Sequence, residues 1–344
     1  MMATKLTIAA LVVAAIPLSP APVGAFAPVG ARGGRTAPGP RMAATMEEAV
    51  DSTQTYGRGL RAVVVGGGPA GALAALYLAR RSFEVDVYES LPEALPANYA
   101  RSYNIVIFPR GEAALEKAGV KLEDQVAAGT ALRLTGNVRH ARPGASESKG
   151  TKKVSAFSGS VSMDRGGLAR TVLDHAGTFP NVRIHYSHEL DSVDMASSTA
   201  TFNTVDGAGV TCSYHLLVGA DGVNSKIRQA MTDASPDFTY SQNTDHMAFK
   251  TFTIPRILDL PGAEDGWDSC FHVWQFKHGE LLCPPRTDGS LSGTCVLPNA
   301  GKFSFDALMA SPADVHTFFQ ENYPSTFGPE GPSDHFCQEF FSKR

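Results

Sequence analysis

The stretch VVVGGGPAGALAALYLARRSFEVDVYES, residues 63–90, decides the fold that we expect for this chain. A short apolar run over residues 61–65 predicts a buried parallel strand, because both faces of such a strand are covered. Apolar spacing over residues 70–81 then predicts a helix, and alternation over residues 83–88 predicts a second strand. This order is typical of a dinucleotide-binding βαβ unit.

The turn between the first strand and the helix carries a glycine pattern and the start of the helix. These positions are Gly66, Gly68, Pro69, Ala70 and Gly71. Gly66 permits the tight turn, Gly68 lets a pyrophosphate approach the helix N-terminus, and Gly71 lets the helix pack closely on the strand. Glu89 ends the second strand, where a carboxylate accepts both ribose hydroxyls of an adenosine. The motif predicts a dinucleotide without separating FAD from NAD.

A second motif lies in YHLLVGADGVNSKIRQAM, residues 214–231. Residues 214–218 predict a buried strand, and a helix is expected from residue 225, with Ser225 as its N-cap. In the turn between them, Gly222 allows backbone to approach a ligand and Asp221 offers an acceptor. The alternative interpretation is a capped turn that binds nothing.

Together, the glycine pattern and the segment GADGVNSKIR (219–228) resemble the single-component FAD-dependent aromatic hydroxylases. Within that family the kynurenine 3-monooxygenase branch is the most similar. The segments that carry this likeness are RSYNIVIFPRGEAALEKAGV (101–120), PNVRIHYSHEL (180–190), HVWQFKHGELLCPP (272–285) and DVHTFFQENYPS (314–325). The resemblance runs from about residue 60 to the end of the chain.

This resemblance implies an α/β fold like that of para-hydroxybenzoate hydroxylase. A Rossmann-like FAD-binding domain with a parallel sheet is followed by an antiparallel-sheet substrate domain. FAD is then the resident cofactor, NADPH the co-substrate, and a flavin hydroperoxide hydroxylates a small aromatic substrate. Arg101 and Arg110 would lie near the cofactor, although solvated arginines at the two ends of a strand explain them equally well. No catalytic residue is assigned, since the cofactor carries the chemistry.

We expect three parts along the chain: residues 1–55, 56–237 and 238–344. Residues 1–55 combine an apolar run from Leu6 to Leu18 with an acid-free, arginine-bearing stretch from Phe26 to Met46. A signal core followed by a transit-like segment predicts a plastid presequence, with a mitochondrial or plain secretory leader as alternatives. The apolar run is too short to span a bilayer comfortably, and no span is expected in the mature part.

Composition excludes several classes of protein. A formal net charge of −4 and a pI of about 6.2 give no basic surface for nucleic acid. Five scattered cysteines without a C-x-x-C pair argue against a disulfide framework and a zinc cluster. His185 and His188 are expected on opposite faces of one strand, which leaves no metal site. The oligomeric state stays open.

The substrate class is less well defined than the cofactor. The resemblance implies an arginine and a tyrosine that hold an amino-acid carboxylate, but here only Arg133 and Phe157 lie nearby. A carboxylate-bearing substrate is therefore in doubt, and an isoprenoid is the alternative. Phe271, Trp274 and Phe276 are candidates for a pocket wall, with a place in the core as the alternative.

The family also has a third flavin motif, a strand that ends in Gly-Asp, and this dipeptide occurs nowhere in the chain. The final segment DHFCQEFFSKR resembles the strand that precedes that motif. We therefore expect a truncated gene product of low stability and little activity. A short natural protein, including an inactive FAD-binding relic, is the alternative.

Overall fold

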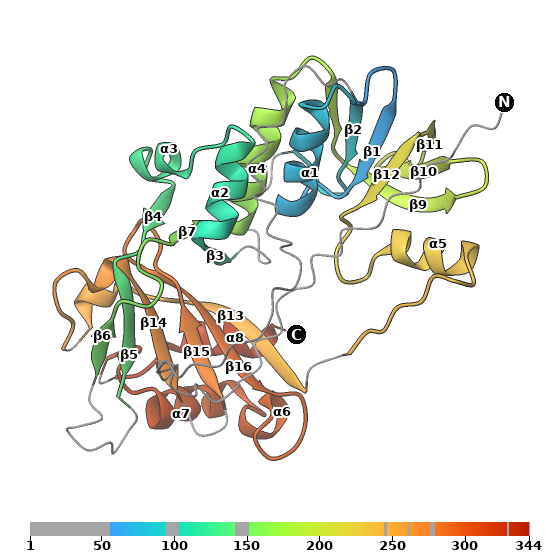
Figure 1. The fold of residues 1–344 in the computed structure, drawn as a ribbon. Helices are drawn as coiled ribbons and strands as arrows, with labels where there is room; N and C mark the ends of the chain where they lie inside the picture. The colour runs from blue at the N-terminus through green and yellow to red at the C-terminus, as the bar shows by residue number, and fades with distance from the viewer. Residues whose placement is uncertain are drawn as a thin grey trace, which may run out of the picture.

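A computed structural model describes residues 56–93, 103–141, 151–243, 246–260, 262–275, 279–328 and 330–343. The expected presequence, 1–55, lies outside these residues. Figure 1 shows the described residues as two lobes, one built on a parallel sheet and the other on a six-stranded sheet. Neither lobe is one continuous stretch of sequence, so the chain passes between them more than once.

The helices are α1 (Pro69–Ala79), α2 (Pro109–Lys117), α3 (Leu122–Ala127), α4 (Arg165–Gly177), α5 (Lys226–Ala234), α6 (Phe305–Leu308), α7 (Pro312–Asn322) and α8 (Asp334–Ser342), with 3₁₀ turns η2 (Ile257–Asp259) and η3 (Trp267–Ser269). The strands are β1 (Arg61–Val65), β2 (Glu84–Tyr88), β3 (Asn104–Ile107), β4 (Ala131–Arg133), β5 (Gly136–His140), β6 (Lys152–Val154), β7 (Val161–Asp164), β8 (Val182–His185), β9 (His188–Asp194), β10 (Thr199–Thr204), β11 (Gly209–Ser213), β12 (Leu216–Gly219), β13 (Met247–Ile254), β14 (Cys270–Gln275), β15 (Glu280–Cys283) and β16 (Leu291–Pro298).

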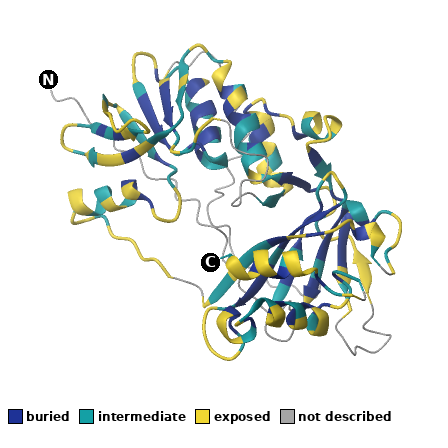
Figure 2. Ribbon diagram, turned by 180° about the vertical axis from the view of Figure 1, so that it is seen from behind, coloured by how far each residue is buried: buried dark blue, intermediate teal, exposed yellow. Residues whose placement is uncertain are grey.

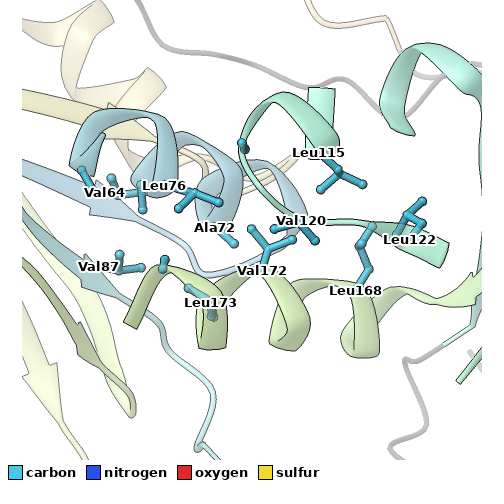
Figure 3. Close-up of a cluster of buried hydrophobic side chains, with 14 of the residues drawn as sticks. Val64, Ala72, Leu76, Val87, Leu115, Val120, Leu122, Leu168, Val172 and Leu173 are labelled. Carbon is cyan, nitrogen blue, oxygen red and sulfur yellow. The ribbon is translucent and has the colours of Figure 1, made fainter. Parts of the chain in front are cut away.

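The first lobe is centred on β1, which pairs in parallel with β12 on one side and with β2 on the other, while β2 pairs with β8. Proline at the first turn and alanine and leucine beyond it favour helix α1. Helices α1 and α4 pack together over one face of the sheet, where Val64, Val87, Leu76 and Val172 are fully buried (Figure 3). The expected βαβ unit and parallel sheet are confirmed.

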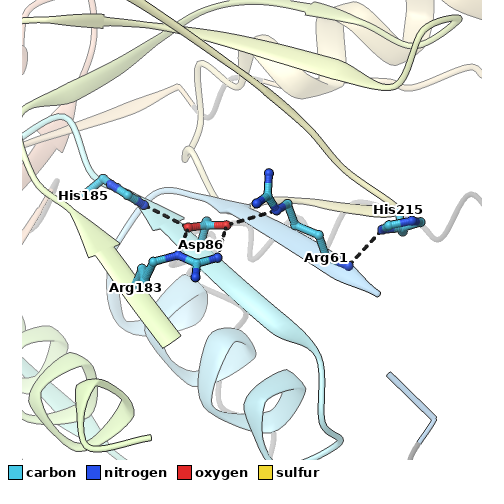
Figure 4. Close-up of polar contacts among 5 residues, drawn as sticks. All are labelled: Arg61, Asp86, Arg183, His185 and His215. Carbon is cyan, nitrogen blue, oxygen red and sulfur yellow. Dashed lines mark hydrogen bonds and ion pairs between the residues drawn. The ribbon is translucent and has the colours of Figure 1, made fainter. Parts of the chain in front are cut away.

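The opposite face of the parallel sheet is covered by the antiparallel strands β9, β10 and β11. On this face Asp86 is buried and lies against the side chains of Arg61, Arg183 and His185 (Figure 4). Arg183 donates to both of its oxygens at 2.8 and 3.1 Å, and His185 and Arg61 lie 2.9 and 3.5 Å away. Burial alone would raise the pKa of Asp86, but hydrogen bonds from His185 and Arg183 outweigh it, so the pKa falls. The carboxylate therefore stays charged and ties β1, β2 and β8 together.

His185 and His188 do not lie on opposite faces of one strand, and that expectation was wrong. The chain bends at Ser187, whose φ is +59°, so that His185 ends β8 and His188 begins β9. Both rings pack against Tyr88, with ring centroids 4.5 and 5.7 Å away. The bend reverses the alternation, which strand periodicity cannot anticipate.

The second lobe holds a sheet in the order β13-β16-β15-β14-β5-β6. The four strands within residues 238–344 are antiparallel, as expected, but β5 joins β14 in parallel and brings β6 with it. The sheet is therefore mixed, and it takes strands from both sides of the expected boundary at residue 237. Figure 2 shows buried residues gathered on its strands and exposed residues on the outer faces of the helices.

Helices α6, α7 and α8 cover one face of this sheet. The final segment was expected to be a strand and is the helix α8 instead. Ser333 caps its N-terminus by accepting from the Phe336 amide, and Cys337 and Phe340 face the core. Trp274 belongs to the same core at 2% exposure, and Phe271 is 8% exposed on the other face, while Phe276 lies outside the described residues. Capping and helical spacing, visible in the sequence, favour the helix.

A small set of buried hydrogen bonds joins the two lobes. The Asn104 amide nitrogen of β3 donates to Ser292 Oγ of β16 at 3.0 Å. Its side-chain Nδ2 lies 3.2 Å from both Ser162 Oγ and the Pro285 carbonyl, and Ser162 Oγ donates to that carbonyl at 2.7 Å. Ser162 and Ser292 are each 1% exposed. The lobes therefore meet at a satisfied polar contact.

Two histidines contact each other in the second lobe, where His272 is buried and His140 is half-buried. His272 Nε2 lies 2.8 Å from the Trp267 carbonyl, which only accepts, so this nitrogen carries the proton. His272 Nδ1 is then an acceptor, and His140 Nε2 donates to it at 2.8 Å. The His140 ring stacks on Trp274 with centroids 3.7 Å apart. Burial lowers the pKa of His272 to about 4 and that of His140 to about 2, so both rings are neutral.

Because of this pair, the stability of the folded protein should fall with acid at pH values well above those at which carboxylates titrate. In the unfolded chain both histidines protonate near pH 6.5, whereas in the folded chain they do not until pH 4 or below. The stabilisation is therefore complete above pH 6.5 and is lost as the pH falls toward 4. Each group contributes about 1.4 kcal/mol per pH unit to the slope in that window. Urea unfolding at pH 7.5, 6.5 and 5.5 measures it.

The double variant His140→Gln with His272→Gln retains donors and acceptors without titrating, so its stability should fall less steeply with acid. His335→Gln, at an exposed position of α8, is the matched control and should keep the wild-type slope. Equal slopes in the double variant and the wild type would show that the buried pair does not cause the acid sensitivity.

Candidate functional site

The two sequence motifs, about 150 residues apart, meet at one edge of the parallel sheet. Strands β1 and β12 run in parallel register, with Val65 opposite Gly219, so the turns that follow them lie side by side. Gly66 has a φ of +98°, and a Cβ there would lie 2.4 Å from the Ala220 carbonyl oxygen. A Cβ on Gly71 would lie 1.9 Å from the Gly66 carbonyl oxygen. Both glycines are required by the fold itself.

Gly68 differs from these two glycines. It precedes α1 with a φ of −62°, an ordinary value for any residue, and a Cβ there would meet nothing within 4 Å. The α1 N-terminus has no side-chain cap, and Pro69 and Ala70 form its first turn. Free amide groups at a helix N-terminus beside open space suit an anionic ligand such as a pyrophosphate.

Glu89 lies next to this loop, just after β2. Its Oε2 accepts from the Gly67 amide at 2.6 Å and its Oε1 accepts from the Leu91 amide at 2.8 Å. The carboxylate is therefore held in place by backbone on both sides. Sequence reasoning missed the role of Gly67, because a backbone donor leaves no mark in a side-chain pattern.

Asp221 and Gly222 occupy the turn after β12. Asp221 Oδ1 accepts from Ser225 Oγ at 2.7 Å and its Oδ2 accepts from the Ile227 amide at 3.2 Å. Ser225 in turn accepts from the Arg228 amide, as the expected N-cap of α5. Gly222 has a φ of +83°. The turn is thus a capped strand–helix connection, and its carboxylate already has partners within the chain.

The two expected cofactor arginines are placed differently. Arg101 lies outside the described residues. Arg110 lies in the first turn of α2 and is exposed. The structure brings the glycine loop, Glu89 and the Asp221 turn together but does not bring Arg110 into contact with them.

Arg133, the candidate anchor for a substrate carboxylate, is engaged within the chain. Its two terminal nitrogens donate to Glu112 at 2.9 and 2.7 Å, and further bonds reach Glu123 and the Gly159 carbonyl. The hydrogen bond from Arg133 lowers the pKa of the Glu112 carboxyl, so the pair is ionised at neutral pH. This cluster ties α2, α3 and β4 together.

The described residues offer neither a metal site nor a membrane-spanning helix. No group of three or more His, Cys, Asp or Glu side chains there could hold a metal ion. None of the helices in the same part of the chain combines the length and apolar character needed to cross a bilayer. An open hollow of about 780 Å³ lies between β9 and α5, and neither the Gly66 loop, nor Glu89, nor the Asp221 turn lines it.

The residues present fit FAD at its adenosine end. A Cβ-free opening at Gly68, uncapped amides on α1 and an oriented carboxylate at Glu89 are the donors and acceptors that a pyrophosphate and a ribose need. Gly68 leaves room that the folded chain itself does not use. The Asp221 turn lies against the same loop.

Comparison with known proteins gives a family. Residues 60–284 match the FAD binding domain family. The chain is similar to kynurenine 3-monooxygenase of Salinispora arenicola, with 34% identity over 270 residues that cover 77% of this chain and 57% of that protein. The enzyme of that name from Legionella pneumophila is 29% identical over 81% of this chain and 60% of its own length. The chain thus spans somewhat under two thirds of these relatives.

Solved structures share the fold. The tetrameric form of 2-methyl-3-hydroxypyridine-5-carboxylic acid oxygenase superposes with a TM-score of 0.61 at 21% identity, over 84% of this chain and 69% of that one. p-Nitrophenol 4-monooxygenase from Pseudomonas putida gives a TM-score of 0.59 at 18% identity, over 80% and 65%. The expected para-hydroxybenzoate-hydroxylase-like fold is confirmed.

Gly68→Val separates ligand binding from folding. The side chain enters space that the protein leaves open, so the melting temperature should stay close to that of the wild type. The same space is needed by the pyrophosphate, so FAD affinity should fall by roughly 100-fold, or about 2.8 kcal/mol. Flavin fluorescence titration and thermal unfolding measure the two effects.

Gly209→Val, on the exposed strand β11, is the matched control, because a Cβ there also meets nothing within 4 Å. It should change neither quantity. Undiminished FAD affinity in Gly68→Val would show that the cofactor does not use this loop.

Proposed function

Because this chain belongs to the FAD binding domain family of class A FAD-dependent aromatic hydroxylases, we propose that it is an NADPH-using monooxygenase for a small aromatic substrate. The proposed activity is that of a whole protein. The longer relatives that this chain matches in part are named kynurenine 3-monooxygenase. Membership of the family supports an oxidoreductase of the monooxygenase class.

The observation that carries this proposal is the meeting of two flavin motifs at one sheet edge. The Gly66 loop and the Ala220 turn approach so closely that a Cβ on Gly66 would clash. A NAD-binding βαβ unit explains the first motif alone. The second motif, placed against it, resembles that of the FAD-dependent hydroxylases, and it lies within residues 60–284, which match the FAD binding domain family. The oriented carboxylate of Glu89 then holds the adenosine ribose.

When bound, FAD supplies the redox chemistry, since its reduced ring activates oxygen. The residues of this chain bind and orient it. The α1 N-terminus neutralises part of the pyrophosphate charge, Glu89 accepts from the ribose, and the Asn104 contact holds the six-stranded sheet against the first lobe. That sheet is where we place the substrate, with an isoprenoid as the alternative to an aromatic ring.

Turnover of NADPH tests the proposal. FAD-loaded protein should oxidise NADPH faster when an aromatic substrate is added, and the product should contain one oxygen atom from O₂. Oxygen-18 labelling with mass spectrometry of a panel of aromatic compounds, kynurenine included, measures both. An inactive FAD-binding relic would bind the cofactor yet show no stimulation across the panel, and that result would overturn the proposed activity.

We also propose that residues 1–55 direct the protein to a plastid. The apolar run and the acid-free, arginine-bearing stretch that follows it support this proposal. A fluorescent protein fused after residue 55 should enter plastids in a cell that has them. Replacing Arg32, Arg35 and Arg41 by Glu should abolish entry. Delivery of the unaltered fusion to mitochondria or to the medium would contradict the proposal.

A further inference from the structure

Three aromatic side chains from separate elements meet where the two lobes adjoin. Phe108 follows β3, Phe157 lies between β6 and β7, and Phe271 lies on β14. The ring centroids of Phe108 and Phe157 are 5.6 Å apart, and those of Phe157 and Phe271 are 4.8 Å apart. Phe271 is buried and Phe108 is 46% exposed, so this aromatic cluster leads from the interior of the protein to its surface.

Phe157, in the middle of the cluster, has a backbone conformation that disfavours a side chain. Its φ is +66°, in the left-handed region where a Cβ crowds the following carbonyl. Glycine would occupy this position without strain. The fold thus holds a phenyl ring between Phe108 and Phe271 at a cost in free energy, and such strain concentrates at sites that bind or act.

A buried acceptor without a donor lies beside the cluster. Asn137 of β5 is the cross-strand neighbour of Phe271 and is 1% exposed. Its Oδ1 has no hydrogen-bond partner among the residues that the structure describes. An unsatisfied buried carbonyl oxygen is costly, and an N–H or O–H group of a ligand would satisfy it.

The charges around the cluster disfavour an anionic ligand. Arg133 donates to the Gly159 carbonyl, two residues from Phe157, but its guanidinium is neutralised by Glu112 and Glu123. Arg110 lies in the first turn of α2 and is exposed. Among the described residues, neither of these two arginines would compensate a carboxylate for the hydration that it loses against the three rings.

We propose that Phe108, Phe157 and Phe271, with Asn137, form a subsite for an uncharged aromatic ring that bears an N–H or O–H donor. This inference rests on the proposed function and narrows its substrate to neutral anilines or phenols. The tilted rings offer both faces and edges to an aromatic ligand, and the amide oxygen of Asn137 accepts from the donor. A substrate whose amino-acid carboxylate must be held at this place is disfavoured.

Calorimetric titration of the full chain with two matched probes tests the subsite. Kynurenine and 2-aminoacetophenone share the aminobenzoyl group, and only kynurenine adds a carboxylate and an ammonium. The neutral ketone should bind at least about tenfold more tightly, a difference of about 1.4 kcal/mol. Equal or tighter binding of kynurenine would overturn the proposal.

Phe157→Gly removes the ring and relieves the strained φ, so the chain should unfold at the same or a higher temperature. Its affinity for 2-aminoacetophenone should fall about tenfold. Phe249→Ala is the control: register places Phe249 on the same face of the sheet, on the far strand β13, and it is 61% exposed. Unchanged ketone affinity in a stable Phe157→Gly protein would overturn the proposal.

A parallel FAD titration keeps this inference apart from the proposed function. Binding of FAD without any binding of the ketone would remove the subsite and leave the proposed function standing. Binding of the ketone that depends on Phe157, in a chain that does not bind FAD, would support the subsite and remove the proposed function.

Discussion

The close approach of two backbone turns is the constraint on which the rest of the structure depends. Because β1 and β12 pair in parallel register, the Gly66 loop and the Ala220 turn leave the sheet at the same edge. The space between them admits no Cβ at Gly66 or Gly71, so the sequence is fixed by packing there. That packing aims the uncapped N-terminus of α1 at open space beside Gly68 and sets Glu89 at its edge. The pairing of β1 with β12 therefore creates a binding site for an anionic dinucleotide at this edge of the sheet.

Local patterns predicted the part of the fold whose contacts are short in sequence. The strand β1, the helix α1 and the strand β2 follow from apolar periodicity and from glycine and proline positions. The N-cap at Ser225 followed in the same way, because it depends on a residue three positions further along the chain. The two motifs meet because the parallel strands β1 and β12 end at a common edge.

The features that sequence reasoning missed depend on backbone groups or on distant partners. The pairing of β5 with β14 joins residues about 130 positions apart, and no local pattern marks it. The bond from the Gly67 amide to Glu89 is made by backbone, and the bend at Ser187 reverses a strand alternation. Asp221 accepts hydrogen bonds from Ser225 and Ile227 at the start of α5. The residue type alone did not reveal these contacts. The final segment resembles a strand of the family, but its N-cap and its helical spacing favour the helix α8 that it forms.

The central claim is that the chain holds FAD by its adenosine half, on the Gly66 loop and Glu89. A competition titration tests it most directly, with bound FAD displaced by either ADP, which carries the adenosine and both phosphates, or FMN, which carries the flavin and one phosphate. The structure predicts that ADP displaces FAD in a one-to-one, saturable manner and that FMN at the same concentration does not. Displacement by FMN with no effect of ADP would contradict the account, because the flavin half would then carry the binding.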